Sequence, residues 1–261
     1  NVTGVQTCAL PISKITKDLG AKDPRSMMLR FHTQTGGSTL TAQQPQNNIV
    51  RVTLQALAAV MGGTQSLHTN ALDESLALPT EHAVRIALRT QQILAHETGV
   101  ANTPDPLGGS YFLERMTLDM EKGCWDYFER LDAMGGMVTA IEQGFPQREV
   151  QEASYRYQRA VEQKEKIIVG VNDFVQEHEP PIDILEIDET VADRQTERTR
   201  KLRETRDIKR WQASIDTLKQ AATDANANMM PFVLDCVRAY ATLGEICDTL
   251  RSVYGTYEEP T

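Results

Sequence analysis

Two strand-like segments, each followed by a helix-like one, constrain the fold of this chain more than any other feature. Residues 27–34 alternate in side-chain character, as a β-strand does, and residues 64–69 form a second short strand. Apolar residues recur at helical spacing across residues 50–61, and Thr80 can cap a later helix that ends at Gly99. This β-α-β-α order predicts parallel strands whose helices cover the outside of a doubly wound sheet or a barrel.

Polar side chains occupy one face of both expected strands. The face contains Arg30, His32 and Gln34 on the first strand, and Ser66, His68 and Asn70 on the second. A parallel strand covered by helices is normally apolar, and a barrel interior is normally filled by aliphatic side chains. Burial of such groups without partners would cost about 1 to 3 kcal/mol each. The pattern therefore favours a hollow interior that holds a ligand or water, with a hydrogen-bonded polar core as the alternative.

The remainder of the chain is expected to be mainly helical. Glycine and proline clusters separate helices over residues 113–131, 138–143 and 148–165, and residues 166–171 are expected to form a short buried strand. Pro180 and Pro181 cannot continue a helix, so we place a domain boundary there, between residues 13–180 and 181–261. One charged helix follows, with apolar residues at heptad-like spacing: Ile208, Trp211, Ile215, Leu218 and Ala222. The last helix opens with a capping box formed by Thr242 and Glu245.

The composition argues against several classes of function. The chain has 27 basic and 36 acidic residues and a net charge of −9, so its field repels nucleic acid. No run approaches the ~18 apolar residues that a membrane span needs. The four cysteines include no C-x-x-C pair and indicate neither a disulfide framework nor a metal site. We therefore expect a protein of the reducing cytoplasm that binds no nucleic acid, no membrane and no metal through its own side chains.

Residues 1–12 are treated separately, because residues 2–12 resemble the in-frame translation of a short-read sequencing adapter. They lack the basic region of a secretory signal, and no charged side chain precedes Lys14. We expect the natural sequence to begin near Ser13 and its own N-terminus to be missing. The chain would then be a C-terminal fragment of a longer protein.

Four motifs resemble the large subunit of methylmalonyl-CoA mutase. They are RFHTQTGGSTLT at residues 30–41, NNIVR at 47–51, GGTQSLHTNALDE at 62–74 and DPLGGSY at 105–111. The similarity runs from about Ser13 to Thr261. It implies an α/β fold, the last two βα units of a (β/α)8 TIM barrel followed by a mainly helical C-terminal region. In that family a CoA ester threads the barrel axis, which explains the polar lining, and adenosylcobalamin caps the C-terminal mouth of the strands.

The resemblance also implies a reaction and a set of site residues. The family isomerises acyl-CoA esters by radical chemistry, and overall similarity favours the interconversion of (R)-methylmalonyl-CoA and succinyl-CoA. By motif, the cofactor-binding positions are Gly37, Asn70, Glu74 and Ala77, with Asn70 and Glu74 at the adenosyl ribose. The substrate-binding positions are His32, Gln34 and Gln65. No catalytic residue can be assigned in this chain, because the cofactor carries the chemistry.

Ser38 and the C-terminal sequence indicate an enzyme made of two kinds of chain. Fused, single-chain mutases usually carry Trp where this chain has Ser38. The family motif Asp-x-His-x-x-Gly, whose histidine is the lower cobalt ligand, does not occur before Thr261. The resemblance therefore implies a hetero-oligomer in which a small cobalamin-binding subunit supplies that histidine.

Other readings of the same residues remain open. They are the large subunit of an isobutyryl-CoA or 2-hydroxyisobutyryl-CoA mutase, and a noncatalytic interaction module that has kept the barrel surface. The residues that distinguish these substrates in the family lie mainly in earlier barrel strands. By itself the chain is expected to be inactive and prone to association, because two barrel strands without the other six leave an unpaired edge.

Overall fold

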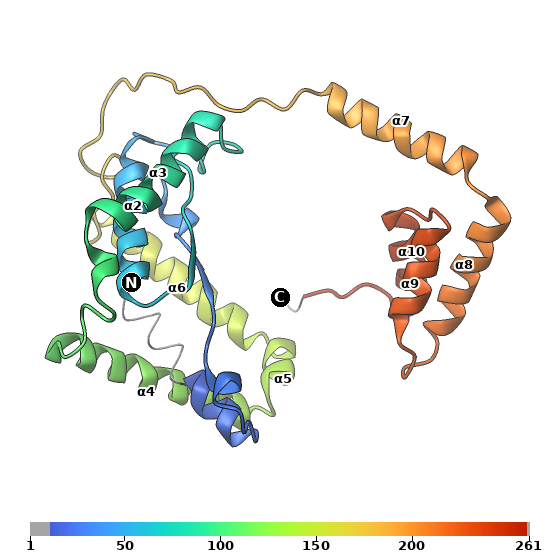
Figure 1. Ribbon diagram of the computed structural model, residues 1–261, viewed down its shortest axis with the longest axis horizontal. Coiled ribbons are helices and arrows are strands. Elements are labelled where there is room, and N and C mark those ends of the chain that lie inside the picture. Colours follow the sequence, from blue (N-terminus) through green and yellow to red (C-terminus); the bar gives the residue numbers. More distant parts are fainter. Residues whose placement is uncertain (1–10, 260–261) are drawn as a thin grey trace. The chain divides into compact units, whose positions relative to one another are not determined.

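The chain divides into two compact units, one ending at Leu185 and the other beginning at Glu186 (Figure 1). A computed structural model describes residues 11–259. Most of the expected adapter-derived segment, residues 1–10, lies outside these described residues. The boundary expected between residues 180 and 181 falls in a stretch without helix or strand, which also contains the division between the two units.

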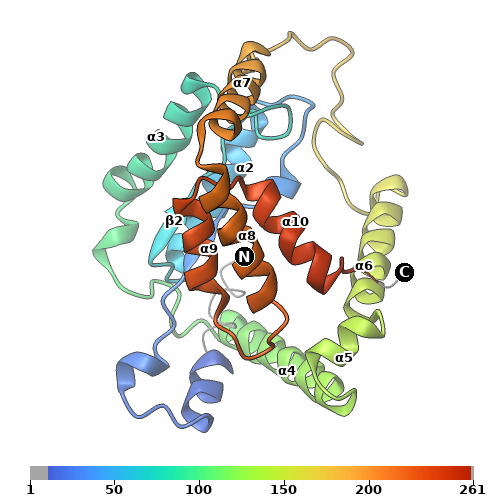
Figure 2. The ribbon, with the colours of Figure 1, turned by 90° about the vertical axis from the view of Figure 1, so that its right-hand side faces the viewer.

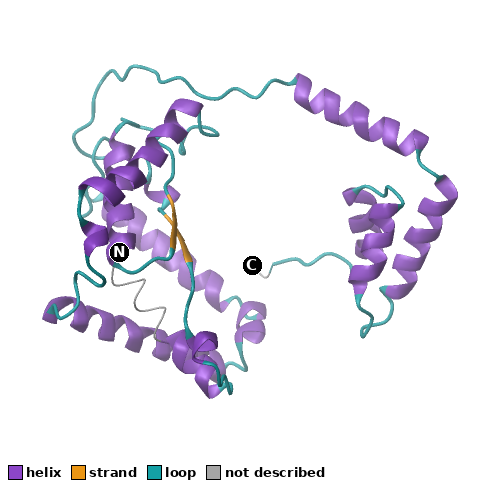
Figure 3. Ribbon diagram, viewed as in Figure 1, coloured by secondary structure: helices purple, strands orange, loops and turns teal. Residues whose placement is uncertain are grey.

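Two parallel strands form the sheet of the first unit, and a helix follows each of them (Figure 3). The elements in chain order are β1 (His32–Gln34), α2 (Asn47–Met61), β2 (Ser66–His68) and α3 (Glu81–Glu97). His32 pairs with Ser66, and Gln34 pairs with His68. The β-α-β-α order and the parallel pairing are confirmed, and together they form two βα units of an α/β barrel type.

Both strands are shorter than the sequence pattern predicts. Residues 24–27 form a 3-10 turn, η1 (Pro24–Met27), because the Asp23 side chain accepts a hydrogen bond from the Arg25 amide and Pro24 favours the turn. The Phe31 amide donates to the side chain of Gln65 at 2.8 Å rather than to a strand. The ladder therefore begins only at His32, and Arg30 precedes it.

Small side chains allow α2 and α3 to pack closely. The buried face of α2 contains Val52, Ala56 and Ala59, and that of α3 begins with Ala83 and Ala87. Alanine contributes little bulk, so the helix axes can approach each other over the sheet. The Thr80 hydroxyl accepts a hydrogen bond from the Ala83 amide at 3.2 Å, which confirms it as the N-cap of α3.

A buried asparagine at the start of α2 holds two loops together. Asn48 is fully buried, and its amide nitrogen donates to the carbonyl oxygens of Thr41 and Leu72, both at 2.9 Å. Its side-chain oxygen accepts hydrogen bonds from the Thr41 amide at 3.1 Å and from Arg51 Nη1 at 2.8 Å. One side chain thus joins the loop after β1 to the loop after β2, and satisfies main-chain groups that would otherwise be buried without partners.

Helices complete the first unit. They are η3 (Val100–Asn102), a 3-10 turn, followed by α4 (Tyr111–Ala133), α5 (Met137–Glu142) and α6 (Phe145–Glu162). Glu149 on α6 joins α6 to α4, because it accepts hydrogen bonds from the Tyr127 hydroxyl at 2.5 Å and from Arg130 Nη2 at 3.2 Å. These bonds lower the pKa of the Glu149 carboxyl below its ordinary value, the tyrosine bond having the larger effect.

The prediction of a short strand over residues 166–171 is wrong. This segment forms only an isolated bridge between Val169 and Asp173. The Asn172 side chain accepts a hydrogen bond from the Ile168 amide at 2.7 Å and donates to the Lys166 carbonyl at 2.7 Å. These local bonds close a turn around Gly170, which has a φ of 82°, and so compete with strand pairing.

The second unit is entirely helical in its described part. It comprises α7 (Thr190–Thr205), α8 (Ile208–Ala221), α9 (Met229–Arg238) and α10 (Leu243–Tyr254). The single charged helix expected here is therefore two helices. The break occurs because Arg206 has extended backbone and the Asp207 side chain caps α8 by accepting from the Arg210 amide at 3.0 Å. No helix within residues 11–259 is long and apolar enough to cross a membrane.

Helices α8, α9 and α10 lie side by side around a small core (Figure 2). Leu218, Cys236 and Ile246, one from each helix, are buried in contact with one another. Burial raises the pKa of the Cys236 thiol. The predicted capping box is confirmed, because the Thr242 hydroxyl accepts from the Glu245 amide while the Glu245 carboxylate accepts from the Thr242 amide.

A buried ion pair ties the start of this bundle to its last helix. The Arg206 side chain is only 4% exposed and binds both carboxylate oxygens of Glu245, at 2.6 and 2.7 Å. Its guanidinium also lies 4.1 Å from the ring centroid of Trp211. Arg206 lowers the pKa of the Glu245 carboxyl to about 2. The capping box and the ion pair therefore share one carboxylate.

Replacing Asn48 by Ala should lower the stability of the first unit by roughly 2–4 kcal/mol, because several buried main-chain groups lose their partner. Native-state hydrogen exchange of the α2 amides measures this loss. The matched control is Asn47→Ala, which removes only a half-buried bond to Gln44 at 2.9 Å and should cost about 1 kcal/mol or less. Equal exchange rates in the two variants would contradict the role given to Asn48.

Replacing Glu245 by Gln should destabilise the helical unit by about 2–3 kcal/mol at pH 7, because Arg206 keeps a buried charge without its partner. The folded-state pKa of Glu245 lies below its unfolded value of 4.5, so this stabilisation is complete above that value. It is lost as the pH falls from 4.5 towards 2, where parent and variant should converge. Urea unfolding followed by Trp211 fluorescence, in a Trp125→Phe background, measures the difference.

The control for this experiment is Asp248→Asn on the same helix. Asp248 pairs only with Arg251, and both side chains are more than half exposed. Exposed pairs contribute little, so this variant should stay close to the parent at every pH. A Glu245→Gln deficit that persisted unchanged at pH 2 would exclude the ion pair as its cause.

Candidate functional site

The polar face expected from the sequence exists, and it is open. His32, Gln34, Ser66 and His68 are exposed, whereas Thr33 and Leu67 on the opposite face are half-buried towards the helices. The His32 ring nitrogen Nδ1 lies 2.7 Å from the Ser66 hydroxyl oxygen. The enclosed interior inferred from the sequence is therefore not formed by the described residues, because two strands present one face and cannot surround it.

The two strands end in a corner of tightly bonded polar groups. The Thr35 amide donates to the His68 carbonyl at 3.0 Å, and the Asn70 amide donates to the Thr35 hydroxyl at 2.9 Å. The Asn70 side chain donates to the Thr35 carbonyl at 3.0 Å and accepts from Gln34 Nε2 at 2.8 Å. Asn70 is only 2% exposed, so this network fixes its carboxamide in one orientation.

Gly37 closes this corner from the side of the first loop. It lies in the turn η2 (Gly37–Thr39), and a Cβ atom placed on it would lie 3.0 Å from Asn70 Nδ2 and 3.3 Å from Glu74 Oε1. The three residues therefore converge, although they come from two loops. The absence of a side chain at Gly37 leaves its backbone accessible beside two polar side chains. Glu74 is exposed, so its carboxylate can accept hydrogen bonds from a ligand.

Asp73 and Glu74 are adjacent but point into different surroundings. Asp73 is 1% exposed, and its Oδ2 accepts a hydrogen bond from the Thr80 amide at 2.9 Å. Its carbonyl accepts from the amides of Leu76 and Ala77 at 2.8 and 3.1 Å. Asp73 thus folds the loop that carries Glu74, and it leaves Glu74 at the surface. Ala77 lies in the same loop and is half-buried.

Gln65 lies at the opposite end of β2 from this corner. Its side-chain oxygen accepts from the Phe31 amide and its nitrogen donates to the Gly63 carbonyl, both at 2.8 Å. The carboxamide therefore joins the segments that precede both strands. His32 and Gln34 lie between Gln65 and the corner, so the residues singled out by sequence occupy three levels along the open face: the strand entrance, the strands and the corner.

Gln55 is a residue that the sequence pattern did not single out. Its side-chain oxygen accepts from the Gly36 amide at 2.6 Å, and its nitrogen donates to the Thr39 hydroxyl at 2.7 Å. The Thr39 hydroxyl in turn donates to the Gly36 carbonyl at 2.6 Å. Gln55 therefore clamps the turn that carries Gly37 onto α2. A signal was present in the sequence. Asn48 lies four residues before Val52 and Gln55 lies three residues after it, so both polar side chains fall near the apolar stripe of α2.

The remaining histidines and acidic side chains form no comparable site in the described part of the chain. His82 and His96 are both exposed on α3 and lie almost the length of the helix apart. No group of three or more histidine, cysteine or acidic side chains within residues 11–259 is arranged to hold a metal ion. On α7, Arg200 pairs with Glu197 and Glu204.

Comparison with known proteins places these residues in one family. The family model described as methylmalonyl-CoA mutase matches residues 12–256. The chain is 46% identical over 249 residues to the 2-hydroxyisobutanoyl-CoA mutase large subunit of Aquincola tertiaricarbonis. It is 44% identical over 246 residues to a methylmalonyl-CoA mutase of Rhizobium meliloti, and 41% identical over 251 residues to the methylmalonyl-CoA mutase large subunit of Propionibacterium freudenreichii subsp. shermanii.

The matches cover most of this chain but a smaller share of the relatives. They span 95%, 94% and 94% of the chain, and 44%, 35% and 34% of the three relatives in the same order. The chain therefore spans less than half the length of these proteins. With a family model that covers nearly all of its described residues, the chain belongs to the methylmalonyl-CoA mutase family.

Proposed function

We propose that the protein carrying this chain isomerises an acyl-CoA ester with the help of adenosylcobalamin. In this proposal the chain contributes the face along which the substrate lies and the corner that meets the cofactor. One observation carries it: the open polar face of β1 and β2 continues without interruption into the corner formed by Gly37, Asn70 and Glu74. Family membership and the names of the relatives support the same chemistry.

The residues of the corner suit adenosylcobalamin. Gly37 has no side chain to block a bulky ligand, and a Cβ there would crowd Asn70 and Glu74. An exposed carboxylate such as Glu74 can accept hydrogen bonds from two adjacent ribose hydroxyls. Asn70 is held in one orientation and needs no reorganisation on binding. When bound, adenosylcobalamin would supply the radical that removes a hydrogen atom from the substrate. Ala77 would contribute a small side chain at the edge of the same loop.

The open face would orient the acyl-CoA ester. Ser66 fixes the His32 ring through Nδ1, which leaves Nε2 available for a substrate oxygen. Gln34 is held by Asn70, so a substrate contact at Gln34 would be coupled to the cofactor corner. Gln65 would line the strand entrance. The role of these side chains is to bind and orient, since none of them has a geometry that requires proton transfer.

The favoured substrate pair is (R)-methylmalonyl-CoA and succinyl-CoA. A second candidate is 2-hydroxyisobutanoyl-CoA, because a relative with that name is 46% identical to this chain. Isobutyryl-CoA is a further member of the same chemical class. All three share the CoA moiety and differ at the acyl group, so the strand residues described above suit each of them.

A second polypeptide would complete the cofactor site. Two of the relatives are named as large subunits, which implies smaller partners in those enzymes. Ser38 supports the same arrangement here, because a small side chain at the corner leaves room that a Trp would fill. We propose a small cobalamin-binding subunit whose histidine ligates cobalt, in a hetero-oligomer located in the cytoplasm.

Replacing Glu74 by Ala in the complete enzyme should weaken adenosylcobalamin binding by about 10- to 100-fold, because one charge-assisted contact to the ribose is lost. The kcat should fall as well, while the affinity for the CoA ester should change little. Titration of the cofactor by visible absorbance, and of the CoA ester by calorimetry, separates the two effects.

Glu81→Ala is the matched control, because Glu81 is an exposed carboxylate whose only ion-pair partner among residues 11–259 is Arg85 on the same helix. It should leave both affinities unchanged. Gly37→Ala is a second test, since its Cβ would press on Asn70 and Glu74, and it should reproduce the cofactor defect. Normal cofactor affinity in both Glu74→Ala and Gly37→Ala would remove these residues from the cofactor site.

The substrate can be assigned by assaying the complete enzyme with all three CoA esters. We expect turnover of methylmalonyl-CoA at least tenfold faster, as kcat/KM, than turnover of 2-hydroxyisobutanoyl-CoA. The reverse order would assign the second candidate. An enzyme that binds adenosylcobalamin but turns over none of the three esters would instead support a noncatalytic protein of this family.

A further inference from the structure

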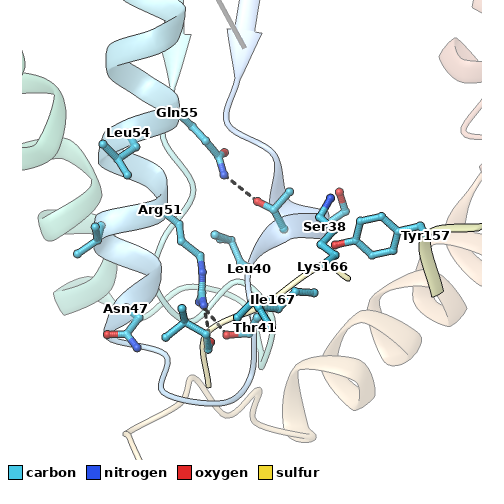
Figure 4. A pocket seen from close by; sticks show the side chains of 14 residues that line it. Ser38, Leu40, Thr41, Asn47, Arg51, Leu54, Gln55, Tyr157, Lys166 and Ile167 are labelled. Atoms are coloured by element: carbon cyan, nitrogen blue, oxygen red, sulfur yellow. Dashed lines mark hydrogen bonds between the residues drawn. The ribbon is translucent and has the colours of Figure 1, made fainter. Parts of the chain in front are cut away.

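A separate pocket lies between α2, the loop after β1 and residues 166–169 (Figure 4). Its volume is about 590 Å³, within the range of small-molecule sites in proteins. Tyr157 from α6 forms one wall of it. His32, Gln34, Asn70 and Glu74 do not line this pocket, so it is distinct from the open polar face.

Two cations, Arg51 and Lys166, line the pocket, and neither has a carboxylate partner among residues 11–259. Arg51 Nη1 donates to the Thr41 hydroxyl and to Asn48 Oδ1, both at 2.8 Å, and Arg51 Nη2 donates to the Val169 carbonyl at 2.7 Å. All three acceptors are neutral. Lys166 Nζ lies 4.3 Å from the ring centroid of Tyr157, and forms no ion pair within residues 11–259. A half-buried guanidinium and an ammonium thus share one cavity in a chain with a net charge of −9.

The rest of the lining combines hydroxyl groups with an apolar wall. Hydroxyls come from Ser38, Thr39, Thr41 and Tyr157. The apolar wall comes from Leu40, Val50, Leu54, Ile167 and Val169. Val50 and Leu54 are 59% and 62% exposed, although they are large aliphatic side chains on a helix that otherwise buries its apolar face. Exposed apolar side chains are unfavourable in water, and a ligand that joins an anionic group to an apolar one would cover them while it neutralises the two cations.

We propose that this pocket binds a small amphipathic anion, in which a phosphate or carboxylate group is joined to an apolar moiety. The anionic group would lie between Arg51 and Lys166 and accept hydrogen bonds from the hydroxyls of Ser38 and Tyr157, because those of Thr39 and Thr41 already donate to main-chain carbonyls. The apolar part would cover Val50 and Leu54. This inference does not depend on the mutase activity, because Gly37, Asn70, Glu74 and the side chains of the open face do not line the pocket, although Ser38 from the same turn as Gly37 does.

The test uses the complete protein that carries this chain, and four probes. Hexyl phosphate carries both features, inorganic phosphate lacks the apolar part, 1-hexanol lacks the charge, and hexylammonium reverses it. Ligand-observed NMR titration should show binding of hexyl phosphate with a Kd at least tenfold lower than for any other probe. Equal binding of hexyl phosphate and 1-hexanol would overturn the proposal, as would the absence of hexyl phosphate binding.

Two variants locate the binding site. Lys166→Gln removes one cation and should weaken hexyl phosphate binding about five- to tenfold. Leu54→Asp places a carboxylate in the apolar wall and should weaken it more than tenfold. Both side chains are exposed, and circular dichroism checks that helix content is unchanged. Arg51 is kept, because it also supports the loop around Asn48.

Lys122→Gln is the charge-matched control. Lys122 is exposed on α4 and does not line the pocket, so its loss should leave the affinity unchanged. If Lys122→Gln weakened binding as much as Lys166→Gln, the attraction would be a general charge effect and the proposed site would be wrong. The same conclusion would follow if Leu54→Asp bound hexyl phosphate with the parent affinity.

Discussion

Buried carboxamide side chains are the interaction on which the site of this protein depends. Asn48 joins the loop after β1 to the loop after β2, and Asn70 joins the ends of the two strands. Both are at most 2% exposed, so water cannot replace the bonds that they make. Loops are ordinarily the most mobile parts of a domain. Here the loops that carry Gly37 and Glu74 are held by side chains from the rigid elements beneath them.

Burial also separates structural polar groups from polar groups that remain accessible to a ligand. Asp73 is buried and organises its loop through the Thr80 amide, while Glu74 beside it remains exposed and free to meet a ligand. The Gln55 carboxamide is held by the Gly36 amide and the Thr39 hydroxyl, and that of Gln65 by two main-chain groups, so both support the face at its ends. His32 and Gln34 keep one side of their polar groups available. For the two adjacent carboxylates, the division between support and proposed ligand contact therefore follows burial rather than residue type.

The helical unit is organised by a different interaction, the ion pair of Arg206 and Glu245. Arg206 ends the segment before α8, and Glu245 belongs to the capping box of α10. A buried guanidinium without its carboxylate would be strongly unfavourable, so the pair links two helix ends that are distant in sequence. Around it the core is small and formed by Leu218, Cys236 and Ile246. This unit is therefore held by polar contacts of Arg203 and Arg206 with the start of α10 and by one compact apolar centre.

The sequence by itself determined the order of elements, the parallel βα units, the Thr80 cap and the Thr242–Glu245 capping box, because these features depend on local periodicity and on side chains within one helical turn. It also singled out Gly37, Asn70 and Glu74 by family motifs, although their convergence joins residues more than thirty positions apart and only the tertiary structure shows it.

Two predictions failed for the same reason: the strand expected at residues 166–171, and the unbroken helix expected across Arg206–Asp207. In both places a side-chain hydrogen bond, from Asn172 or Asp207, competes successfully with the apolar pattern. The clamping roles of Asn48 and Gln55 likewise required the folded chain, since a carboxamide on a helix acquires a role only when a specific loop lies against it.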